Sequence, residues 1–451
     1  MLALFVCYTD RHMNLRRVIS PFLALPLILL ATLLAWLIIE QATPAPEPPP
    51  PPVMPAEEIR HPEILSATSS AETTLTPPPE AATTTEIIPP PAKPSIRPSA
   101  AGTLPVEATS NLGSIGTIAW HSGAKTLFMA VYEPNNGRAI WKLPPDGVPV
   151  KVLQADPGTA DITVTIDDTG AVYAEWDSPP EIVRSDDEGA TWTQVLGGVG
   201  TFWQIATGPG DVRYGTLHED NQALLYRSLD GGLSWSAWMD FQKILPQDAT
   251  RYDPFDHHFR LRHLHGVIIQ KNTLLVGTGD VARYTMASTD TGQTWRQVWD
   301  EGFTASTATS EGDAVLLAPD QLNSHGIVKL DLATLTPREV WNPIPYGWAG
   351  FCYSMLDVGG FYYAGMHTEP NSVSSLKPKY GVIVSPDGER WYPLLTLGPV
   401  SQDADSSLWL AKGDGDVYVS ISGELYTLPP IDASWFRGKT PFPKPTTEVI
   451  P

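Results

Sequence analysis

The sequence predicts an all-β fold, a seven-bladed β-propeller that follows one transmembrane helix and a disordered, proline-rich stalk. Three observations favour it. An eight-residue turn recurs at spacings of 43, 60 and 97 residues, short strand-like segments lie between the copies, and no long amphipathic helix follows residue 112. Periods of about 40–50 residues, each with four strands, are typical of propellers.

The recurring turn reads SDDEGATW from Ser185, SLDGGLSW from Ser228 and STDTGQTW from Ser288, with a shorter SPDGERW from Ser385. In such a turn the Asp carboxylate can accept N–H groups of its own backbone, and Gly supplies a positive φ. The Trp then leaves the turn and packs against the blade. The residues expected in these structural roles are Asp187, Gly189, Trp192, Asp230, Gly232, Trp235, Asp290, Gly292, Trp295, Asp387 and Trp391.

The pattern Ser-x-Asp-x-Gly-x-Thr/Ser-Trp resembles the Asp-box, or BNR, repeat of sialidase-like propellers, over roughly residues 112–436. The resemblance implies a fold and no activity, because the family includes glycosidases, assembly factors and sorting receptors. A sialidase needs three arginines on separate blades. Here the rim arginines cluster at one blade junction, namely Arg251, Arg260, Arg262 and Arg283, and the early Arg-Ile-Pro motif is missing. We therefore expect a function-divergent member of the family.

Strand-like segments such as TLFMAVY, AVYAEW, TLLVGTG and FYYAGMH are short, rich in aromatic or β-branched residues, and bounded by Gly, Asp or Asn. Dividing the chain at its turns gives seven units, and counts of six or eight stay open. The expected blades, within a domain at 111–438, are 112–156, 157–198, 199–256, 257–301, 302–345, 346–398 and 399–436.

A predominantly apolar run of 22 residues, 18–39, is long enough to cross a hydrocarbon core of about 30 Å. Arginines precede the run, which places residues 1–17 in the cytoplasm and the rest outside. We expect an uncleaved anchor in a bacterial inner membrane, with the C-terminal domain in the periplasm. A cleaved signal peptide and a secreted protein are the alternative, and translation starts at Met1 or Met13.

Residues 40–110 are rich in Pro, Thr, Ala and Glu, and such a composition buries too little apolar surface to offset the entropy of ordering. We expect a disordered stalk there and a Pro-rich tail at 439–451. A passive spacer is the simplest interpretation, and a docking segment for a proline-binding partner is the alternative.

The net charge of −21 argues against nucleic acid as a partner, because such binding needs clustered Lys and Arg. The two cysteines, Cys7 and Cys352, lie in very different segments, so a disulfide is not expected. Cys352 is interpreted as a buried free thiol.

The recurring turns join the third and fourth strands, so we expect function on the opposite face, where loops follow the second strand of each blade. Six of these loops carry acids or histidines. We expect an acidic, histidine-bearing ring at the mouth of the central channel, and ordinary loop polarity is the alternative. The residues concerned are Glu133, Asp177, His218, Glu219, Asp220, Asp280, Arg283, Asp320, His367 and Glu369.

The segment RYDPFDHHFRLRHLHGVII, at the entry to the fourth blade, holds four of the ten histidines. His263 and His265 are two residues apart on the expected innermost strand, so both point to one side, and Asp280 ends the neighbouring strand. Two His and an Asp could ligate a divalent metal. General acid–base catalysis and a hydrogen-bonded structural pair are the other interpretations. No cofactor is firmly predicted.

We expect this face to bind a glycan or an envelope protein. A glycoside hydrolase or lyase, using rim carboxylates and histidines, is the alternative, and an assembly factor for a membrane complex is the third. Whether the protein is an enzyme stays open at this point. For catalysis the candidates are His263, His265, Asp280, Glu219 and Glu369. For ligand contact they are His218, Arg260, Arg262, Arg283, His367, Asp256 and His258.

Overall fold

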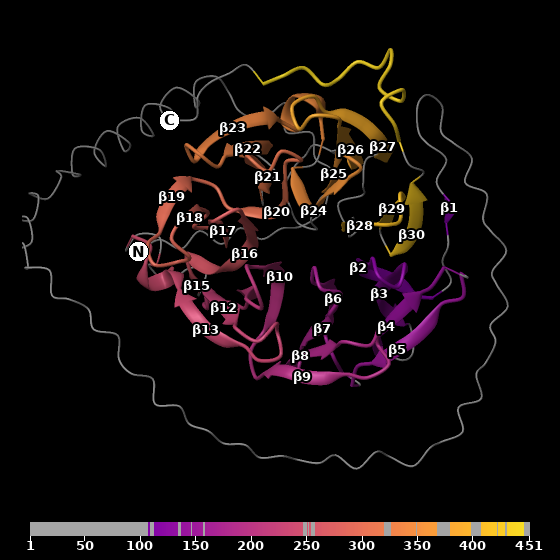
Figure 1. Cartoon of the computed structure of the whole chain (residues 1–451), viewed down its shortest axis with the longest axis vertical. Helices are drawn as coiled ribbons and strands as arrows, with labels where there is room; N and C mark the ends of the chain where they lie inside the picture. Colours follow the sequence, from indigo (N-terminus) through magenta and orange to yellow (C-terminus); the bar gives the residue numbers. More distant parts are fainter. Residues whose placement is uncertain are drawn as a thin grey trace, which may run out of the picture. The chain divides into compact units, whose positions relative to one another are not determined.

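The computed structural model describes residues 107–445, with gaps at 109–111, 134–136, 146, 157, 247–249, 251, 254–257, 320–325, 349, 368–378, 398–406, 422 and 429–430. Within these residues seven four-stranded antiparallel sheets surround a central channel, as Figure 1 shows. The predicted all-β, seven-bladed propeller is confirmed. The predicted anchor lies outside the described residues, as does nearly all of the predicted stalk. In the described part of the chain no helix is long and apolar enough to cross a bilayer.

Six blades each use four consecutive strands. Blade 1 has β2 (Ser114–His121), β3 (Thr126–Glu133), β4 (Gly137–Leu143) and β5 (Val150–Gln154). Blade 2 has β6 (Ile162–Ile166), β7 (Val172–Asp177), β8 (Pro180–Ser185) and β9 (Thr193–Gly197). Blade 3 has β10 (Thr201–Thr207), β11 (Arg213–His218), β12 (Leu224–Ser228) and β13 (Ser236–Asp240). Blade 4 has β16 (Leu261–Gln270), β17 (Thr273–Asp280), β18 (Thr285–Ser288) and β19 (Arg296–Trp299). Blade 5 has β20 (Phe303–Ala308), β21 (Ala314–Pro319), β22 (Ile327–Asp331) and β23 (Thr336–Trp341). Blade 6 has β24 (Phe351–Val358), β25 (Phe361–His367), β26 (Tyr380–Ser385) and β27 (Tyr392–Leu397). The first strand of each blade faces the centre (Figure 1).

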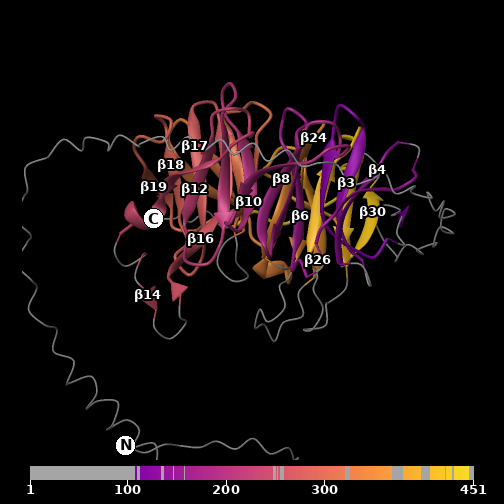
Figure 2. The same ribbon diagram turned by 90° about the horizontal axis from the view of Figure 1, so that it is seen from below.

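Shorter elements connect these blades. A two-stranded hairpin, β14 (Tyr252–Asp253) and β15 (His258–Phe259), lies between blades 3 and 4, and Figure 2 shows it projecting from one end of the propeller. Two single 3-10 turns, η2 (Phe241–Lys243) and η3 (Ile344–Tyr346), follow β13 and β23.

The seventh blade joins the two ends of the propeller. It consists of β28 (Leu408–Lys412), β29 (Val417–Ile421), β30 (Glu424–Leu428) and, as its outer strand, β1 (Glu107–Ala108). This outer strand comes from before residue 111, where the sequence placed the start of the domain. The junction has two further bonds, since Ile115 N donates to Gly423 O at 2.8 Å and Ser420 Oγ donates to Ile115 O at 2.7 Å. The first and last strands of the propeller therefore pair and close the ring.

Neighbouring blades bury both faces of the second strands. As a result β3 and β17 are buried along nearly their whole length, and their sequences show continuous apolar runs rather than alternation. Cys352 lies in the core between blades 5 and 6, fully buried, and burial raises its pKa to about 12. Phe442, within the predicted tail, also packs on this core, and its N–H donates to Trp391 O at 2.8 Å.

The recurring turns share one hydrogen-bond pattern. In the copy at Ser185, the Ser Oγ accepts from Gly189 N and donates to Asp187 Oδ1, both at 2.8 Å. Asp187 in turn accepts from Thr191 N at 2.8 Å and from Thr191 Oγ1 at 2.6 Å. The glycine φ is 85°, a conformation that favours Gly. The same bonds recur around Asp230 and Asp290, and Asp387 accepts the N–H groups of Glu389 and Arg390.

The tryptophans of these turns pack in different ways. Trp192 Nε1 donates to Val152 O of the preceding blade at 3.1 Å, so it links two blades. Trp235 and Trp295 instead donate to the glycine carbonyl of their own turn. Trp391 is almost fully buried between blades 5 and 6.

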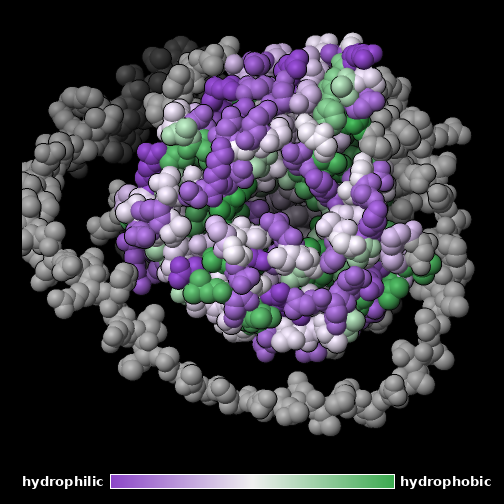
Figure 3. Space-filling model, in the orientation of Figure 1, coloured by the Kyte–Doolittle hydropathy of each residue, from purple (hydrophilic) through white to green (hydrophobic). Residues whose placement is uncertain are grey.

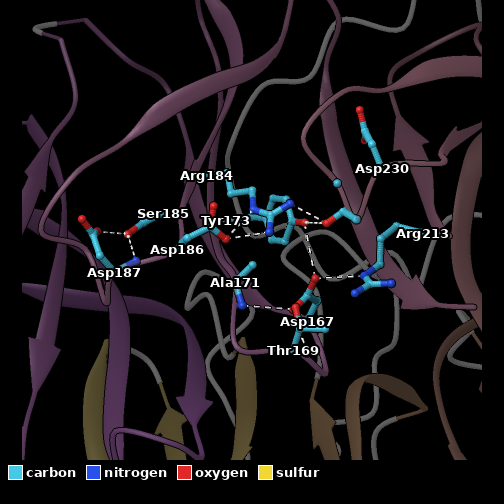
Figure 4. A network of polar contacts seen from close by, with 12 residues as sticks. Asp167, Thr169, Ala171, Tyr173, Arg184, Ser185, Asp186, Asp187, Arg213 and Asp230 are labelled. Carbon is cyan, nitrogen blue, oxygen red and sulfur yellow. Dashed lines mark hydrogen bonds and ion pairs between the residues drawn. The ribbon is translucent and has the colours of Figure 1, made fainter. Parts of the chain in front are cut away.

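A buried ion pair links blades 2 and 3 (Figure 4). Arg213 Nε, at the start of β11, lies 2.9 Å from Asp167 Oδ2, and both side chains are almost completely shielded from water. Asp167 also accepts from the N–H groups of Thr169 and Ala171 at 2.9 and 3.0 Å. Burial alone would raise the pKa of Asp167, but the hydrogen bonds from Thr169 and Arg213 outweigh it and lower the pKa. The carboxylate therefore remains ionised inside the protein.

Replacing Arg213 with Ala leaves that buried carboxylate without its cation. We expect the free energy of unfolding to fall by about 3–5 kcal/mol. Chemical denaturation of the full-length chain at neutral pH measures the loss. Lys125→Ala is the control, because its ion pair with Asp414 is exposed and is expected to contribute below about 1 kcal/mol. If both variants lost equally little free energy of unfolding, the inference that Arg213 stabilises an ionised, buried Asp167 would be contradicted.

The turn aspartates predict weaker folding in acid. Hydrogen bonds from the Thr191 and Thr294 hydroxyls lower the pKa of Asp187 and of Asp290 to about 2, from an ordinary 3.8. A lowered folded-state pKa contributes stability above the unfolded value, and this contribution is lost as the pH falls through the folded value. We expect the melting temperature to drop as the pH falls from about 4 to about 2, and to drop less in the Asp187→Asn/Asp290→Asn double variant. If the melting temperatures of the wild-type protein and the double variant fell equally with pH, these two aspartates would be excluded as the origin of the acid sensitivity.

Candidate functional site

The propeller has two unlike ends. The recurring turns lie at one end, here named the turn face. The loops after each second strand and the connections between blades lie at the other, here named the loop face, from which the β14–β15 hairpin projects (Figure 2). Leu261, at the start of β16, pairs with Asp280, at the end of β17, so both residues lie at the loop face. His263 and His265 follow along β16, just inside this end, opposite the turns, as predicted.

Three histidines converge there from two blades. His218 ends β11 of blade 3, while His263 and His265 come from β16 of blade 4. One ring nitrogen from each of the three lies within 4.8 Å of the others, and His263 Nε2 is 2.9 Å from His265 Nε2. Asp280 Oδ2 is 3.5 Å from His263 Nε2, and Asp220 Oδ1 is 3.7 Å from His263 Nδ1. We name His218, His263 and His265 the histidine cluster.

Arg262 holds the two carboxylates beside this cluster, and Arg283 holds the backbone of Asp280. Arg262 NH1 lies 2.8 Å from Asp280 Oδ2, and its NH2 lies 2.9 Å from Asp220 Oδ1. Arg283 donates to the backbone oxygen of Asp280 at 2.9 Å and to Glu301 Oε2 at 2.8 Å. These bonds hold Asp280 in a left-handed conformation, φ 63°, which costs a non-glycine residue energy. The carboxylates are therefore positioned before any ligand arrives.

Gly279 makes room for the cluster. A Cβ at this position would collide with the His265 ring, so only glycine fits beside the imidazole. On the other side the Trp203 ring packs on the rings of His218 and His265, with centroids 4.9 and 5.2 Å apart. The His265 carbonyl also accepts the Thr216 hydroxyl. Backbone and aromatic packing thus set the position of the cluster.

Burial keeps His218, His265 and His367 neutral. It lowers the pKa of His218 to about 3, with help from the nearby His263, and the same causes lower the pKa of His265 well below its usual value. Burial also lowers the pKa of His367, to about 3. At neutral pH these three rings therefore carry no charge, and a neutral imidazole has one nitrogen that can accept a hydrogen bond or ligate an ion.

The pKa values of two nearby carboxyl groups, those of Glu219 and Asp280, are shifted in opposite directions. Burial raises the pKa of Glu219, and the negative charge of Asp177 raises it further. Burial would also raise the pKa of Asp280, but the hydrogen bond and charge of His263 outweigh it and hold the pKa far below its usual value. Glu219 is thus the carboxyl that more readily keeps its proton.

A cavity of about 1150 Å³ occupies the central channel. Its wall includes residues of β2, β6, β10, β20, β24 and β28, and His218 also lines it. Figure 3 shows the molecule hollowed at the centre of the ring. One edge of the histidine cluster, at His218, therefore borders the channel.

Aromatic side chains gather in this cavity near the loop face. Trp203, Tyr353 and Trp409 come from the early positions of β10, β24 and β28, and their ring centroids lie 4.9, 5.2 and 6.0 Å apart. We name them the aromatic cluster. None of the three residues was predicted from the sequence. Their signal is an aromatic residue at the second or third position of three innermost strands, in TFWQ, FCYS and LWLA.

The remaining predicted residues lie elsewhere. His367 packs on Tyr353 of the aromatic cluster, with 3.9 Å between ring centroids, and Arg260 is exposed. Glu133, predicted for the acidic ring, is instead buried, with bonds of 2.8 Å to Trp141 Nε1 and Lys151 Nζ. Its burial under these partners removes it from the channel mouth. Four predicted residues lie outside the described residues or have side chains that do, namely Asp256, His258, Asp320 and Glu369.

No protein-family model matches the chain, and no curated protein matches it. Solved structures similar to it include a catalytically inactive variant of virginiamycin B lyase from Staphylococcus aureus with quinupristin (14% identity, TM-score 0.52, 73% of this chain and 99% of that chain). A streptogramin B lyase is also similar (13% identity, TM-score 0.50, 72% of this chain and 96% of that chain). So are the WD40 repeats of RRP9 (10% identity, TM-score 0.51, 75% of this chain and 99% of that chain). At such identity the likeness shows the class of fold, a β-propeller.

Adding a methyl group at Gly279 tests how the cluster is supported. We expect Gly279→Ala to lower the free energy of unfolding by about 1–3 kcal/mol, because the new Cβ displaces the His265 ring. Denaturation measures the loss, and imidazole NMR signals report the displacement. Gly197→Ala, whose Cβ would meet only the end of the exposed Gln194 side chain, is the control, with a change within about 0.5 kcal/mol. An unchanged His265 signal in Gly279→Ala would contradict the packing argument.

Proposed function

We propose that the loop face of this propeller binds a neutral glycan, with sugar rings entering the central channel. The observation that carries the proposal is the aromatic cluster inside a cavity of about 1150 Å³. Small-ligand sites are typically concave, largely apolar, and equipped with a few polar groups that orient the ligand. A sugar ring has an apolar C–H face that packs on an aromatic ring and hydroxyl edges that need hydrogen-bond partners. The channel offers both.

The polar groups of the channel suit hydroxyl edges. Asp177, Thr201 and Gln204 line the cavity beside the aromatic cluster, and carboxylates, hydroxyls and amides can all accept from sugar hydroxyls. Two further acids, Asp161 and Asp414, line the cavity together with two basic residues, Lys412 and Arg138, and Arg138 is stacked on a tyrosine ring 4.1 Å away. An excess of acids disfavours an anionic glycan, so the proposal is for a neutral one.

The setting of the domain belongs to the same proposal. The apolar run 18–39 and the stalk at 40–110 support a propeller tethered outside a bacterial inner membrane. Cell-envelope glycans are abundant in that compartment, and an envelope protein is a further ligand of this face. We also propose a divergent Asp-box propeller, which the shared hydrogen-bond pattern of the turns at Asp187, Asp230 and Asp290 supports.

A carbohydrate-active enzyme is the second candidate, and one observation favours it. Glu219 follows β11 and Asp280 ends β17, the second strands of adjacent blades, and the pKa values of the two residues are shifted in opposite directions. Two carboxyl groups whose pKa values are shifted apart can divide the acid and base roles between them. Glycan turnover that is lost in both Glu219→Gln and Asp280→Asn would favour the enzyme, whereas binding without products would favour the binding module.

Removing aromatic rings from the channel tests the binding proposal. We expect Trp203→Ala and Trp409→Ala each to weaken binding of a neutral oligosaccharide at least about tenfold, or about 1.4 kcal/mol. Calorimetric titration of the full-length chain against neutral and anionic oligosaccharides measures the affinity. Trp203→Phe should keep most of the binding, because a ring remains.

The control for this experiment is Trp238→Ala. Trp238 lies on the outer strand β13, packed against Tyr214 and beneath Arg227, outside the residues that line the channel. Its loss should leave affinity unchanged. An equal loss of affinity in the control, or no binding to any neutral oligosaccharide, would reject the proposal.

A further inference from the structure

We infer that the histidine cluster, His218, His263 and His265, binds one transition-metal ion of the zinc, cobalt, nickel and copper class. Three imidazoles from two blades bring ring nitrogens within 4.8 Å of one another. A tetrahedral ion with metal–nitrogen bonds of about 2.0–2.1 Å places its ligand atoms roughly 3.3 Å apart. The 2.9 Å between His263 Nε2 and His265 Nε2 differs from that spacing by only a few tenths of an ångström.

A hydrogen-bonded histidine pair explains less of this geometry. Such a pair needs only His263 and His265, which lie on one strand. His218 comes from a different blade, yet its ring centroid lies 4.1 Å from that of His263. Gly279 and Trp203 further confine the rings from both sides. Three buried or half-buried imidazoles with ring nitrogens within 4.8 Å of one another form the ligand set of a nitrogen-coordinated ion.

The surroundings complete a metal site. A ligating histidine usually directs its other ring nitrogen at a carboxylate, and His263 Nδ1 lies 3.7 Å from Asp220 Oδ1. Arg262 holds that carboxylate at 2.9 Å. Asp280 Oδ2, 3.5 Å from His263 Nε2, is close enough to become a fourth ligand after a small movement. Asp220 and Asp280 also offset the charge of the ion.

The donor atoms select the class of ion. Calcium and magnesium need a shell of six or more oxygens, whereas imidazole nitrogen suits zinc, cobalt, nickel and copper. Because His218 lines the cavity, the site borders the channel on the side of this ligand. This inference stands apart from glycan binding, because no sugar is needed for an ion to bind.

Metal titration of the full-length chain tests the site. The protein is stripped with a chelator and titrated with Zn²⁺, and with Co²⁺ for its visible absorption bands. We expect one tight site per chain, a tetrahedral Co²⁺ spectrum, and a melting temperature that rises with Zn²⁺. His218→Ala and His263→Ala should each weaken binding at least about a hundredfold, and Asp220→Asn about tenfold.

The control is His121→Ala. His121 lies at the turn-face end of β2, where its Nδ1 accepts from Ala124 N at 2.9 Å, and its loss should leave metal affinity unchanged. Should His263→Ala fail to fold, His218→Gln decides, because His218 is only half-buried. Tight binding unaltered by His218→Gln, or no stoichiometric binding by the wild-type protein, overturns the inference. Either result leaves the sugar titrations interpretable, since these are run in chelator.

Discussion

Closure of the ring is the constraint on which the rest of the structure depends. β1 completes the sheet of β28, β29 and β30, so a strand from before the first blade becomes the outer strand of the last. With the ring closed, every innermost strand begins at the loop face. Side chains near those beginnings must then share one narrow space. The aromatic cluster and the histidine cluster both result from this convergence of strands that are distant in the sequence.

The two faces have different physical tasks. On the turn face, carboxylates accept backbone N–H groups within their own turns, and the buried pair of Arg213 and Asp167 joins two blades. These interactions satisfy polar groups internally and leave few donors for a ligand. On the loop face, the polar groups line a cavity instead. There the contacts with Arg262 and Arg283 hold Asp280 in its left-handed conformation.

Local spacing decided what the sequence could predict. The turn repeats predicted seven blades, because each turn is specified by its own residues. His263, His265 and Asp280 lie in one blade, so the two-residue period of a strand predicted their proximity, and Asp280 lies 3.5 Å from His263. The contact of His218 with that group depends on how two blades pack, which no local spacing reports. For the same reason the three rings of the aromatic cluster, which come from three blades, were not predicted.

The two clusters meet at Trp203. Its ring packs on His218 and His265 on one side and on Tyr353 on the other, with centroids 4.9, 5.2 and 4.9 Å away. An ion held by the histidines would restrict His218 and, through it, the position of Trp203. A ligand stacked on Trp203 would restrict the same rings from the channel. Because binding free energies at linked sites are reciprocal, each occupant would change the affinity for the other by the same factor.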